Sequence, residues 1–587
     1  MDIREYLKDN ILLFDGGMGT YYEEKKKKYG VSCELANLSE SDTILKIHRE
    51  YIEAGCKAIK TNTFSSNRIT YMGDSDLTRR VIEEGYRLAT SASGEDSYVF
   101  ADIGPISGLP DEGALLDEYR FVIDCFIECG AKYFLFETNS SLDGLLESAK
   151  YIKEKINDSF IILNFTVQAD GYTREGHYVT TLLNEVAKSP YVDASGLNCG
   201  LGAGHMDSLI KPLKFRNSIL SFMPNAGYPV VLHNRVHYDG DPRYFAEKLK
   251  EIAEKGGKIL GGCCGTTPLH MKEAGELLKD IIVKNEEEEV EEVKEKKTDK
   301  KNIFLKRLEK GKKVIAVELD PPLDTNVSLF MEDAALLKSK GIDIITIADC
   351  PVARARMDSS ILACKVKREL KMNVLPHLTC RDRNLNATKA LLMGLYAEDV
   401  RNVLLVTGDP VPTAERDEVK SVYQFNSRKL ASFVGTLNDT LFPTELSMFG
   451  ALNINAKNFD IQLKVAKEKE ENGMIGFLTQ PVLTPEAFEN LKRAKEELKG
   501  YILGGIIPVV SAKNARYMDS EVNGIKVDKK IIDLYEGKSR EEGEALAKEI
   551  SIRIAKEISP YIDGYYFMIP FRRTNLICDI IDEVRNF

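Results

Sequence analysis

Short apolar runs recur along this sequence of 587 residues, and each run is followed by a longer amphipathic segment. Strands that are buried on both faces read as continuous apolar runs, and strands that alternate with helices build parallel sheets. The first half contains eight such runs, which read ILLFDGG, AIKTNTF, YVFADIG, YFLFETN, IILNFTV, ASGLNCG, LSFMPNAG and ILGGCCG. Eight repeats predict a (β/α)8 barrel, or TIM barrel, although alternation alone would also fit a doubly wound open sheet.

The second half repeats the pattern with eight further runs, VIAVELDPP, IITIADC, VLPHLTC, NVLLVTGD, MFGALNIN, MIGFLTQP, ILGGIIPVVS and GYYFMIPF. We therefore predict an α/β protein of two tandem TIM barrels, at residues 1–283 and 302–587. Between them, residues 284–301 read KNEEEEVEEVKEKKTDKK, which has too few apolar residues to form a core. This segment is predicted to be a charged linker, with a solvated extension of the preceding helix as the alternative.

Composition and charge limit the classes of partner. The chain has 29% charged residues, 43% hydrophobic residues and a net charge of −11, which is typical of a cytosolic globular protein and offers no general attraction to nucleic acid. The N-terminal MDIREYLKDN carries charges where a secretory signal needs an apolar run, and no stretch reaches the length of a membrane span. We expect a cytoplasmic protein that binds neither nucleic acid nor membrane. Eleven irregularly spaced cysteines favour free thiols or metal ligands over a disulfide framework.

Polar residues gather at the C-terminal ends of the predicted strands, the face on which TIM barrels build their active sites. In the first half these residues are Asp15, Asn62, Asp102, Glu137, Asn198, Cys199, Asn225, Cys263 and Cys264, and in the second half they are Glu318, Asp349, His377, Thr379, Asp409, Asn453 and Gln480. We therefore expect an active site at this face of each barrel.

Three cysteines are expected to meet at the mouth of the first barrel. Cys199 ends the sixth predicted strand in GLNCG, and Cys263 and Cys264 end the eighth in GGCCGT. Three thiolates suit Zn²⁺ and leave a fourth position open, which is typical of a catalytic zinc site. Two alternatives remain. The cysteines could pack as small apolar groups, or the adjacent pair could be redox-active, although it lacks C-x-x-C spacing and a vicinal disulfide is strained.

The first half resembles the zinc-dependent homocysteine S-methyltransferase family in DGGMGT (15–20), TNTF (61–64), FET (136–138), GLNCG (196–200), PNAG (224–227) and GGCCGT (261–266). The resemblance implies Zn²⁺ on Cys199, Cys263 and Cys264, with the homocysteine sulfur as fourth ligand. It also implies that Asp15 and Glu137 hold the amino group of homocysteine; the alternative is that both are structural or helix-capping acids. Metal binding would convert the substrate thiol into a thiolate, which attacks an activated methyl group.

The second half resembles methylenetetrahydrofolate reductase, a flavin-carrying barrel, in AVELDPP (316–322), PHLTCRD (376–382), NVLLVTGDP (402–410), FLTQP (477–481) and GGIIPVVS (504–511). The resemblance implies bound FAD, hydride transfer to the methylene carbon of the folate, and 5-methyltetrahydrofolate as product. Glu318 matches the proton donor of the family, and an apolar strand context would raise its pKa as that role requires. The alternative is a helix cap.

Further residues of the second half match cofactor and substrate contacts of this family. Asp409 matches an acidic residue beside the flavin that also contacts folate, and is otherwise an ordinary turn residue. His377, Thr407 and Gly408 match flavin contacts, and Gln480 matches a folate contact. Lys469 is the best-placed residue for the flavin phosphates, but its neighbours match the family poorly. No G-x-G-x-x-G follows a predicted strand, so the reductant is NAD(P)H entering the same mouth, or a reduced protein.

The methyl donor of the first barrel is left open by the sequence. A sulfonium compound such as S-methylmethionine or S-adenosylmethionine is chemically easier than methylfolate, whose methyl group sits on a poor leaving group. Cobalamin-dependent methionine synthases use a similar zinc barrel, so the first barrel could instead work with a separate cobalamin protein that relays the methyl group of methylfolate; the chain itself has no D-x-H-x-x-G signature. A non-catalytic zinc scaffold or thiol sensor is the alternative from another class.

Overall fold

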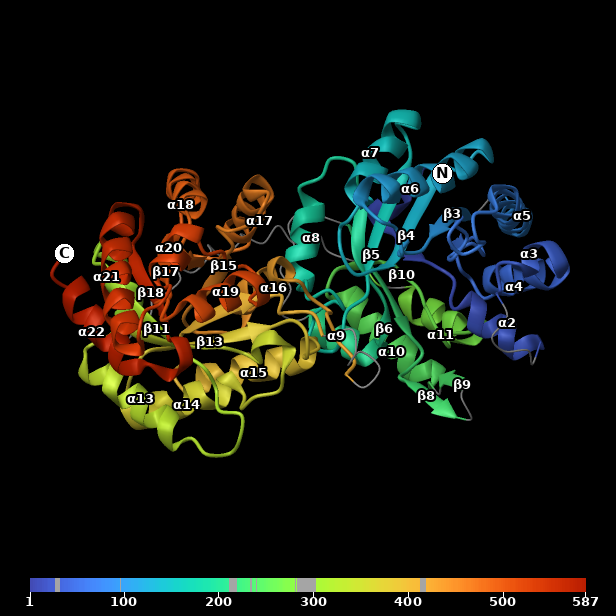
Figure 1. The fold of residues 1–587 in the computed structure, drawn as a ribbon. Coiled ribbons are helices and arrows are strands. Elements are labelled where there is room, and N and C mark those ends of the chain that lie inside the picture. The colour runs from blue at the N-terminus through green and yellow to red at the C-terminus, as the bar shows by residue number, and fades with distance from the viewer. Residues whose placement is uncertain are drawn as a thin grey trace. The chain divides into compact units, whose positions relative to one another are not determined.

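The computed structural model describes residues 1–26, 32–94, 97–210, 219–232, 235–238, 240–279, 281, 302–411 and 419–587. The chain divides into two compact units, Met1–Val293 and Lys294–Phe587. The linker predicted at residues 284–301 lies outside the described residues. In each unit the helices surround the strands (Figure 1). Among the described residues, no helix has the length and apolar character needed to cross a membrane.

The first unit contains an eight-stranded parallel sheet in the order β1-β10-β7-β6-β5-β4-β3-β2. Its two end strands meet where Phe14 bridges to Ala58, and the Asp15 amide donates to the Ala58 carbonyl at 3.0 Å, so the sheet closes into a barrel. The strands are β1 (Leu12–Leu13), β2 (Ala58–Lys60), β3 (Tyr98–Ile103), β4 (Tyr133–Asn139), β5 (Phe160–Phe165), β6 (Ala194–Gly202), β7 (Ile219–Asn225) and β10 (Gly257–Leu260).

Eleven helices of the first unit are described, and they account for the amphipathic segments of the sequence. They are α1 (Ile3–Asp9), α2 (Met18–Lys26), α3 (Ala36–Ser39), α4 (Ser41–Glu53), α5 (Ser75–Ser93), α6 (Glu112–Glu128), α7 (Leu145–Lys155), α8 (Val179–Ala187), α9 (Ala203–Ile210), α10 (Pro242–Glu254) and α11 (Pro268–Leu278). The sequence did not lead us to expect the antiparallel hairpin of β8 (Pro229–Leu232) and β9 (Arg235–Tyr238) that follows β7.

The second unit is a closed barrel of parallel strands in simple sequence order. These strands are β11 (Val314–Leu319), β12 (Ile344–Ile347), β13 (Val374–Thr379), β14 (Asn402–Val406), β15 (Ser447–Leu452), β16 (Gly476–Pro481), β17 (Tyr501–Ile506) and β18 (Gly564–Met568). Each matches one of the eight predicted runs. The prediction of two TIM barrels in an α/β chain is therefore confirmed.

The helices of the second unit are α12 (Ile303–Glu309), α13 (Ser328–Ser339), α14 (Ser359–Leu370), α15 (Leu385–Ala397), α16 (Ser427–Thr440), α17 (Phe459–Glu471), α18 (Pro485–Glu497), α19 (Ala512–Glu521), α20 (Lys529–Leu534), α21 (Arg540–Ile558) and α22 (Thr574–Val584). Three of them, α19 to α21, stand between β17 and β18, where the pattern of the other strands predicts a single helix.

An N-terminal helix packs on the interior residues of each barrel. In the first unit, Ile3 and Leu7 of α1 cluster with barrel residues such as Phe100, and in the second unit Phe304 and Leu308 of α12 do the same. These side chains are almost fully buried, so each barrel interior is a packed core and not a channel. Polar groups are left to the strand ends, where the candidate sites lie.

Candidate active sites

The sulfur atoms of Cys199, Cys263 and Cys264 form a cluster at the mouth of the first barrel. All three lie within 4.8 Å of one another, and the sulfurs of Cys199 and Cys264 are 3.8 Å apart. Tetrahedral coordination with a Zn–S bond of about 2.3 Å places two sulfurs roughly 3.8 Å apart. The spacing of this pair therefore fits a metal ion held between them, and the three soft donors suit zinc.

The backbone around Cys199 is held in an unusual conformation. Cys199 has a φ of 55° and Gly200 a φ of 68°, so two successive residues occupy the left-handed region. A side chain at Gly200 would also meet the Thr166 hydroxyl at 2.6 Å. Non-glycine residues adopt this conformation only where the surroundings enforce it, and they concentrate at functional sites.

The loop that carries Cys263 and Cys264 is fixed by hydrogen bonds to β7. The Cys263 amide donates to the Pro224 carbonyl at 2.8 Å, and the Ala226 amide donates to the Cys264 carbonyl at 3.0 Å. Gly265, with a φ of 79°, leaves no room for a side chain because Tyr238 packs against it. The two adjacent thiols are thus held at fixed positions before any ligand arrives.

The three thiols also share their protons unequally. Hydrogen bonds from the thiols of Cys263 and Cys264 lower the pKa of Cys199 far below its usual value. The same contacts with Cys199 raise the pKa of both Cys263 and Cys264. These contacts favour the thiolate form of one sulfur of the cluster, and metal binding requires deprotonated sulfur.

Asp15 and Glu137, the predicted amino-group ligands, lie at the same mouth and are buried. Their side chains are 1% and 7% exposed. Burial raises the pKa of Asp15 to about 7 and also raises the pKa of Glu137, while the ammonium group of Lys60 opposes both shifts. Lys60, the last residue of β2, is therefore part of this site, although the sequence pointed to Asn62 as the end of that strand.

Asn198 connects the acidic residues to the cysteines. Its side-chain amide donates to Glu137 Oε2 at 3.1 Å and to the Thr138 hydroxyl at 2.8 Å, and its carbonyl oxygen accepts from the Thr138 amide at 2.7 Å. Thr138 has a φ of 62°, a second strained residue at this mouth. Because Asn198 precedes Cys199, these bonds fix the position of Glu137 relative to the thiol cluster.

Glu318, the predicted acid of the second barrel, lies at the end of β11 between a tyrosine and a histidine. The Tyr566 hydroxyl donates a short hydrogen bond to Glu318 Oε2, and His377 Nε2 lies 3.6 Å from the same oxygen. Burial raises the pKa of Glu318 to about 7, against the lowering effect of the Tyr566 hydrogen bond. Burial lowers the pKa of His377 to about 3, so this histidine is neutral and its Nε2 has no hydrogen-bond partner.

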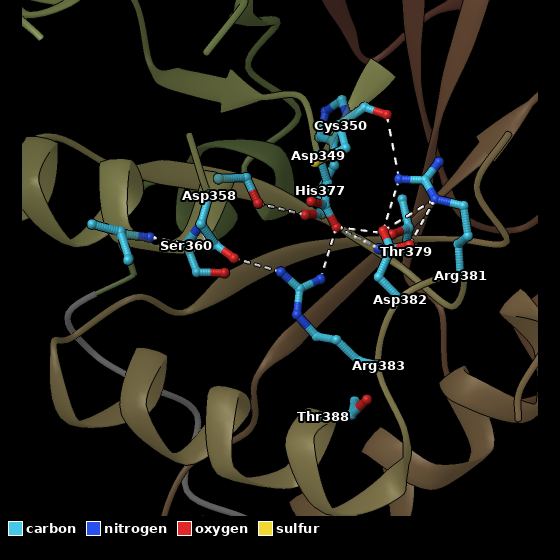
Figure 2. A network of polar contacts seen from close by, with 12 residues as sticks. Asp349, Cys350, Asp358, Ser360, His377, Thr379, Arg381, Asp382, Arg383 and Thr388 are labelled. Atoms are coloured by element: carbon cyan, nitrogen blue, oxygen red, sulfur yellow. Dashed lines mark hydrogen bonds and ion pairs between the residues drawn. The ribbon is translucent and has the colours of Figure 1, made fainter. Parts of the chain in front are cut away.

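A network of arginines and aspartates supports the mouth of the second barrel (Figure 2). Arg383 joins two carboxylates, donating to Asp349 Oδ2 at 2.9 Å and to Asp358 Oδ2 at 2.5 Å. Asp349 Oδ2 in turn accepts from the amide and hydroxyl of Thr379, both at 3.0 Å. The buried Arg381 donates to the backbone carbonyls of Cys350 and Asp409. This network fixes the loops that follow β12, β13 and β14.

The loop after β14 carries three of the predicted cofactor contacts. Asp409 Oδ2 accepts from the Val352 amide at 2.9 Å, and Val352 itself has a φ of 57°. The Thr407 hydroxyl accepts from the Ser427 amide at 3.2 Å, and Gly408 has a φ of 91° with Thr379 close to its Cα. All three residues therefore lie at the mouth, with Asp409 tied to a strained neighbouring loop.

Gln480 and Lys469, the remaining predicted residues, are placed differently from each other. Gln480 lies near the end of β16, half-buried, with its amide close to Gly524. Lys469 is 8% exposed, and its ammonium group donates to the Ala451 carbonyl at 3.0 Å. Burial, with a contribution from Arg428, lowers the pKa of Lys469 to about 8. One donor of the Lys469 ammonium group is therefore used by Ala451, which leaves two for other partners.

Two functional candidates were missed by the sequence analysis. Lys60 is a charged residue inside the apolar run AIKTNTF, and Tyr566 is a tyrosine inside the apolar run GYYFMIPF. Both are polar groups on buried strands, which is a detectable signal because such groups need partners. Neither belongs to the segments that carry the family resemblance, and so neither was selected.

Known proteins resemble the two halves separately. The family model for homocysteine S-methyltransferase matches residues 12–278, and the model for methylenetetrahydrofolate reductase matches residues 304–565. A methionine synthase from Mycobacterium leprae is 32% identical over 300 residues, which are 46% of this chain and 24% of that protein. A methionine synthase from Mycobacterium tuberculosis is 30% identical over 308 residues, 48% of this chain and 26% of that protein. The chain thus spans about a quarter of the length of these relatives.

Solved structures of the homocysteine methyltransferase MmuM from Escherichia coli are similar to about half of the chain. The metallated form covers 47% of this chain and 99% of that chain, with a TM-score of 0.40 and 19% identity. The apo form covers 47% and 98%, with a TM-score of 0.38 and 20% identity. The two matched family models together span most of the sequence, and both describe enzymes. The chain therefore belongs to the homocysteine S-methyltransferase family in its first half and to the methylenetetrahydrofolate reductase family in its second half.

Proposed function

We propose that the protein is a bifunctional enzyme of methionine and one-carbon metabolism. The first unit methylates homocysteine to methionine with the help of Zn²⁺, and the second reduces 5,10-methylenetetrahydrofolate to 5-methyltetrahydrofolate with FAD. The observation that carries the first activity is the cluster of three sulfurs within 4.8 Å. The observation that carries the second is the carboxyl of Glu318 at the end of β11, which is 22% exposed and whose pKa is raised to about 7.

Cys199, Cys263 and Cys264 would hold the zinc ion, and their spacing and soft donor atoms support this assignment. When bound, zinc supplies a Lewis acid that makes the homocysteine thiol nucleophilic at neutral pH. Asp15 and Glu137 would bind the ammonium group of homocysteine, because ionised carboxylates in a buried site form strong charge-assisted hydrogen bonds.

The methyl donor must carry its methyl group on a good leaving group, and this favours a sulfonium compound such as S-methylmethionine or S-adenosylmethionine. A second candidate is suggested by the two methionine synthase relatives. In that case methylfolate is the donor, and a separate cobalamin protein passes the methyl group to the first unit. Methylfolate would then be the product of the second unit and the methyl source of the first.

The methyltransferase proposal is tested by assaying methionine formation from homocysteine. The zinc-loaded protein is incubated with S-methylmethionine, S-adenosylmethionine, methyltetrahydrofolate or methylcobalamin in separate reactions. We expect methionine with at least one donor, loss of activity in Cys199→Ala, and full activity in Cys129→Ala, a cysteine remote from the cluster in sequence and spatial grouping. Stoichiometric zinc without methionine from any donor would instead support a zinc scaffold or thiol sensor.

In the second unit, Glu318 would donate the proton that the reduction requires. Hydride addition to the methylene carbon breaks its bond to N10 of the folate, and N10 takes up a proton. A carboxyl with a pKa of about 7 is protonated in about half of the molecules at neutral pH, so it can serve as this acid. Asp409 and Gln480 would hold the folate beside it.

FAD, when bound, would supply the hydride. His377 offers an unpartnered Nε2, and Thr407 and Gly408 lie on the mouth loop after β14. These positions support the assignment. Lys469 supports it less, because its side chain is buried, with 8% of the residue exposed. NAD(P)H entering the same mouth, or a reduced protein, would regenerate the reduced flavin.

The reductase proposal is tested first by the absorption spectrum of FAD bound to the purified protein. NADH, NADPH and a reduced ferredoxin are then compared as reductants, and oxidation of the reduced flavin by methylenetetrahydrofolate is followed. We expect Glu318→Gln to slow folate reduction by about 10²- to 10⁴-fold, the usual contribution of a general acid. The exposed Glu332→Gln serves as the matched control. Equal rates in the two variants would remove Glu318 from the proposal.

A further inference from the structure

A buried lysine lies among three buried carboxylates at the mouth of the first barrel. Lys60, Asp15, Asp102 and Glu137 come from the ends of β2, β1, β3 and β4, which are neighbours in the barrel. None of the four is more than 5% exposed. We call these four residues the cradle. Asp15 and Glu137 were expected to bind a substrate ammonium group, so an ammonium group supplied by the protein in the same place requires an explanation.

The contacts of Lys60 are close but leave oxygens free. Its Nζ lies 3.8 Å from Asp15 Oδ1 and 3.7 Å from Glu137 Oε2, which is longer than a hydrogen bond, and it donates to the Gly262 carbonyl at 3.3 Å. Asp15 Oδ1 and Asp102 Oδ1 are buried and have no hydrogen-bond partner. Buried carboxylate oxygens without a donor are costly, so these two atoms have an unused capacity to accept a hydrogen bond from a further donor.

The charges of the cradle lead to the same conclusion. A single ammonium group faces three carboxyl groups in this buried site. Burial alone would lower the pKa of Lys60, but the carboxylates of Glu137 and Asp15 outweigh it and raise that pKa above its usual value. Burial raises the pKa of Asp102, with a further contribution from Glu137. Lys60 is therefore a permanent cation, and a second cation would still be attracted.

Among the described residues, the ionisable groups that act on Lys60 include no second cation. Beside the cradle itself, the groups that act on Lys60 or on its carboxylate partners are Cys56 before β2, Tyr51 on α4, Glu34, Cys199 on β6 and Cys263 after β10. All of them are neutral or acidic. The balance between Lys60 and the three carboxylates thus determines the charge that a ligand meets.

We propose that Lys60 is a positioning residue for amino-acid recognition: it is the resident counter-ion of the cradle, and the oxygens it leaves free on Asp15 and Asp102 bind the α-ammonium group of the thiol substrate as a second cation. This inference rests on the proposed function and adds two residues to it. Lys60 opposes the rise in the pKa of all three carboxyl groups, so without it they would hold their protons more tightly and attract ammonium less. The ligand class is a neutral α-amino acid with a sulfur side chain.

The test measures binding and does not depend on methyl transfer. The full-length, zinc-loaded protein is titrated calorimetrically at pH 7 with L-methionine, the expected product, and with 4-(methylthio)butanoate, which lacks only the amino group. We expect wild type to prefer L-methionine by about tenfold or more, the factor for one charge-assisted hydrogen bond. Lys60→Met should lower the affinity for L-methionine by about tenfold and change the affinity for the amino-free analogue by no more than about twofold.

Two conservative variants complete the test. Lys60→Arg keeps the positive charge and should retain most of the affinity for L-methionine, and Asp102→Asn, which is isosteric, should weaken L-methionine only. At pH 8.5 the loss of L-methionine affinity in Lys60→Met should be smaller, because at this pH the carboxyl groups ionise even when no cation is next to them. Thermal melting and zinc content identify any variant that fails to fold. If Lys60→Met does not fold, the affinities of Lys60→Arg and Asp102→Asn for L-methionine test the proposal.

Two results would overturn the proposal. If Lys60→Met binds L-methionine as well as wild type or better, Lys60 competes with the substrate. If it weakens both ligands equally, its role is structural. This test and the test of the proposed activity can fail separately. If the protein prefers L-methionine to the amino-free analogue but methylates no substrate, the recognition site is still supported. Methylation of 4-mercaptobutanoate, the amino-free analogue of homocysteine, as readily as homocysteine removes the cradle and leaves the transferase.

Discussion

The hydroxyl of Tyr566 is predicted to set the pH range in which the second barrel works. It is buried, and it donates to Glu318 Oε2. A hydrogen bond to a carboxylate stabilises the charged form and lowers the pKa of the acid. Burial raises the pKa of Glu318 to about 7 in spite of this bond. Tyr566→Phe removes the donor and leaves the burial unchanged, so the pKa of Glu318 should rise further.

The size of the shift follows from the strength of the bond. A hydrogen bond to a charged group contributes about 1.5–3 kcal/mol, and one pKa unit corresponds to about 1.4 kcal/mol. The pKa of Glu318 should therefore rise by about one to two units, from about 7 to about 8 or 9. A proton donor must be protonated, so the activity of wild type falls as the pH rises through 7. The variant should stay active to higher pH.

The assay is the rate at which methylenetetrahydrofolate oxidises the reduced, flavin-loaded protein between pH 5.5 and 9.5. Infrared spectroscopy of the protonated carboxyl group gives the pKa independently of turnover. Tyr565→Phe is the matched control, because it removes the same group from the neighbouring position of β18 without a contact to Glu318. An alkaline limb that stays in place in Tyr566→Phe, or moves to lower pH, would refute the role given to this hydrogen bond.

Three further predictions concern stability and metal content. Cys264→Ala should abolish stoichiometric zinc in elemental analysis while Cys129→Ala retains it, because only Cys264 belongs to the sulfur cluster. Glu318 holds its proton more tightly in the folded protein, so its contribution to stability is lost as the pH rises from about 4.5 to 7; Glu318→Gln should gain about 3 kcal/mol relative to wild type across this range in denaturant unfolding. Arg383→Met should destabilise the second unit by about 3–5 kcal/mol, since it leaves the buried carboxylate of Asp349 without its ion-pair partner. Adding Asp349→Asn to this variant removes the unpaired charge and should recover part of the lost stability.

The barrel architecture could be predicted because its strands are buried on both faces. Such strands are short continuous apolar runs, and each of the sixteen predicted runs contains a strand of one of the two barrels. The β8–β9 hairpin was not predicted because it does not belong to this repeat, and its strands are only four residues long. The group of helices α19 to α21 was not predicted for a similar reason: an insertion between two strands leaves the strand pattern itself unchanged.

The meeting of the three cysteines was predictable for the same topological reason. Parallel strands of a barrel end at one face, so residues at strand ends converge even when they are far apart in sequence. Strand ends themselves are uncertain by one or two residues. This is why Asn62 was selected on β2 and Lys60 was not, although the structure shows Asn62 bonded to Asn37 and the Cys33 carbonyl as a structural link.

The acids of the two candidate sites lie beside different partners: the side chains of Asp15 and Glu137 are 1% and 7% exposed and face an ammonium group, whereas Glu318 is 22% exposed and faces none. The Lys60 ammonium lowers the pKa of Asp15 and Glu137; burial still raises that of Asp15 to about 7, and a second cation would favour the charged forms further and so be bound. Glu318 faces a tyrosine hydroxyl and a histidine whose pKa burial lowers to about 3, so it has no cationic neighbour among the groups that shift its pKa. It can therefore keep a proton at neutral pH and release it. Placing a cation next to Glu318, as in His377→Lys, should convert it from a proton donor into a cation-binding carboxylate and abolish folate reduction.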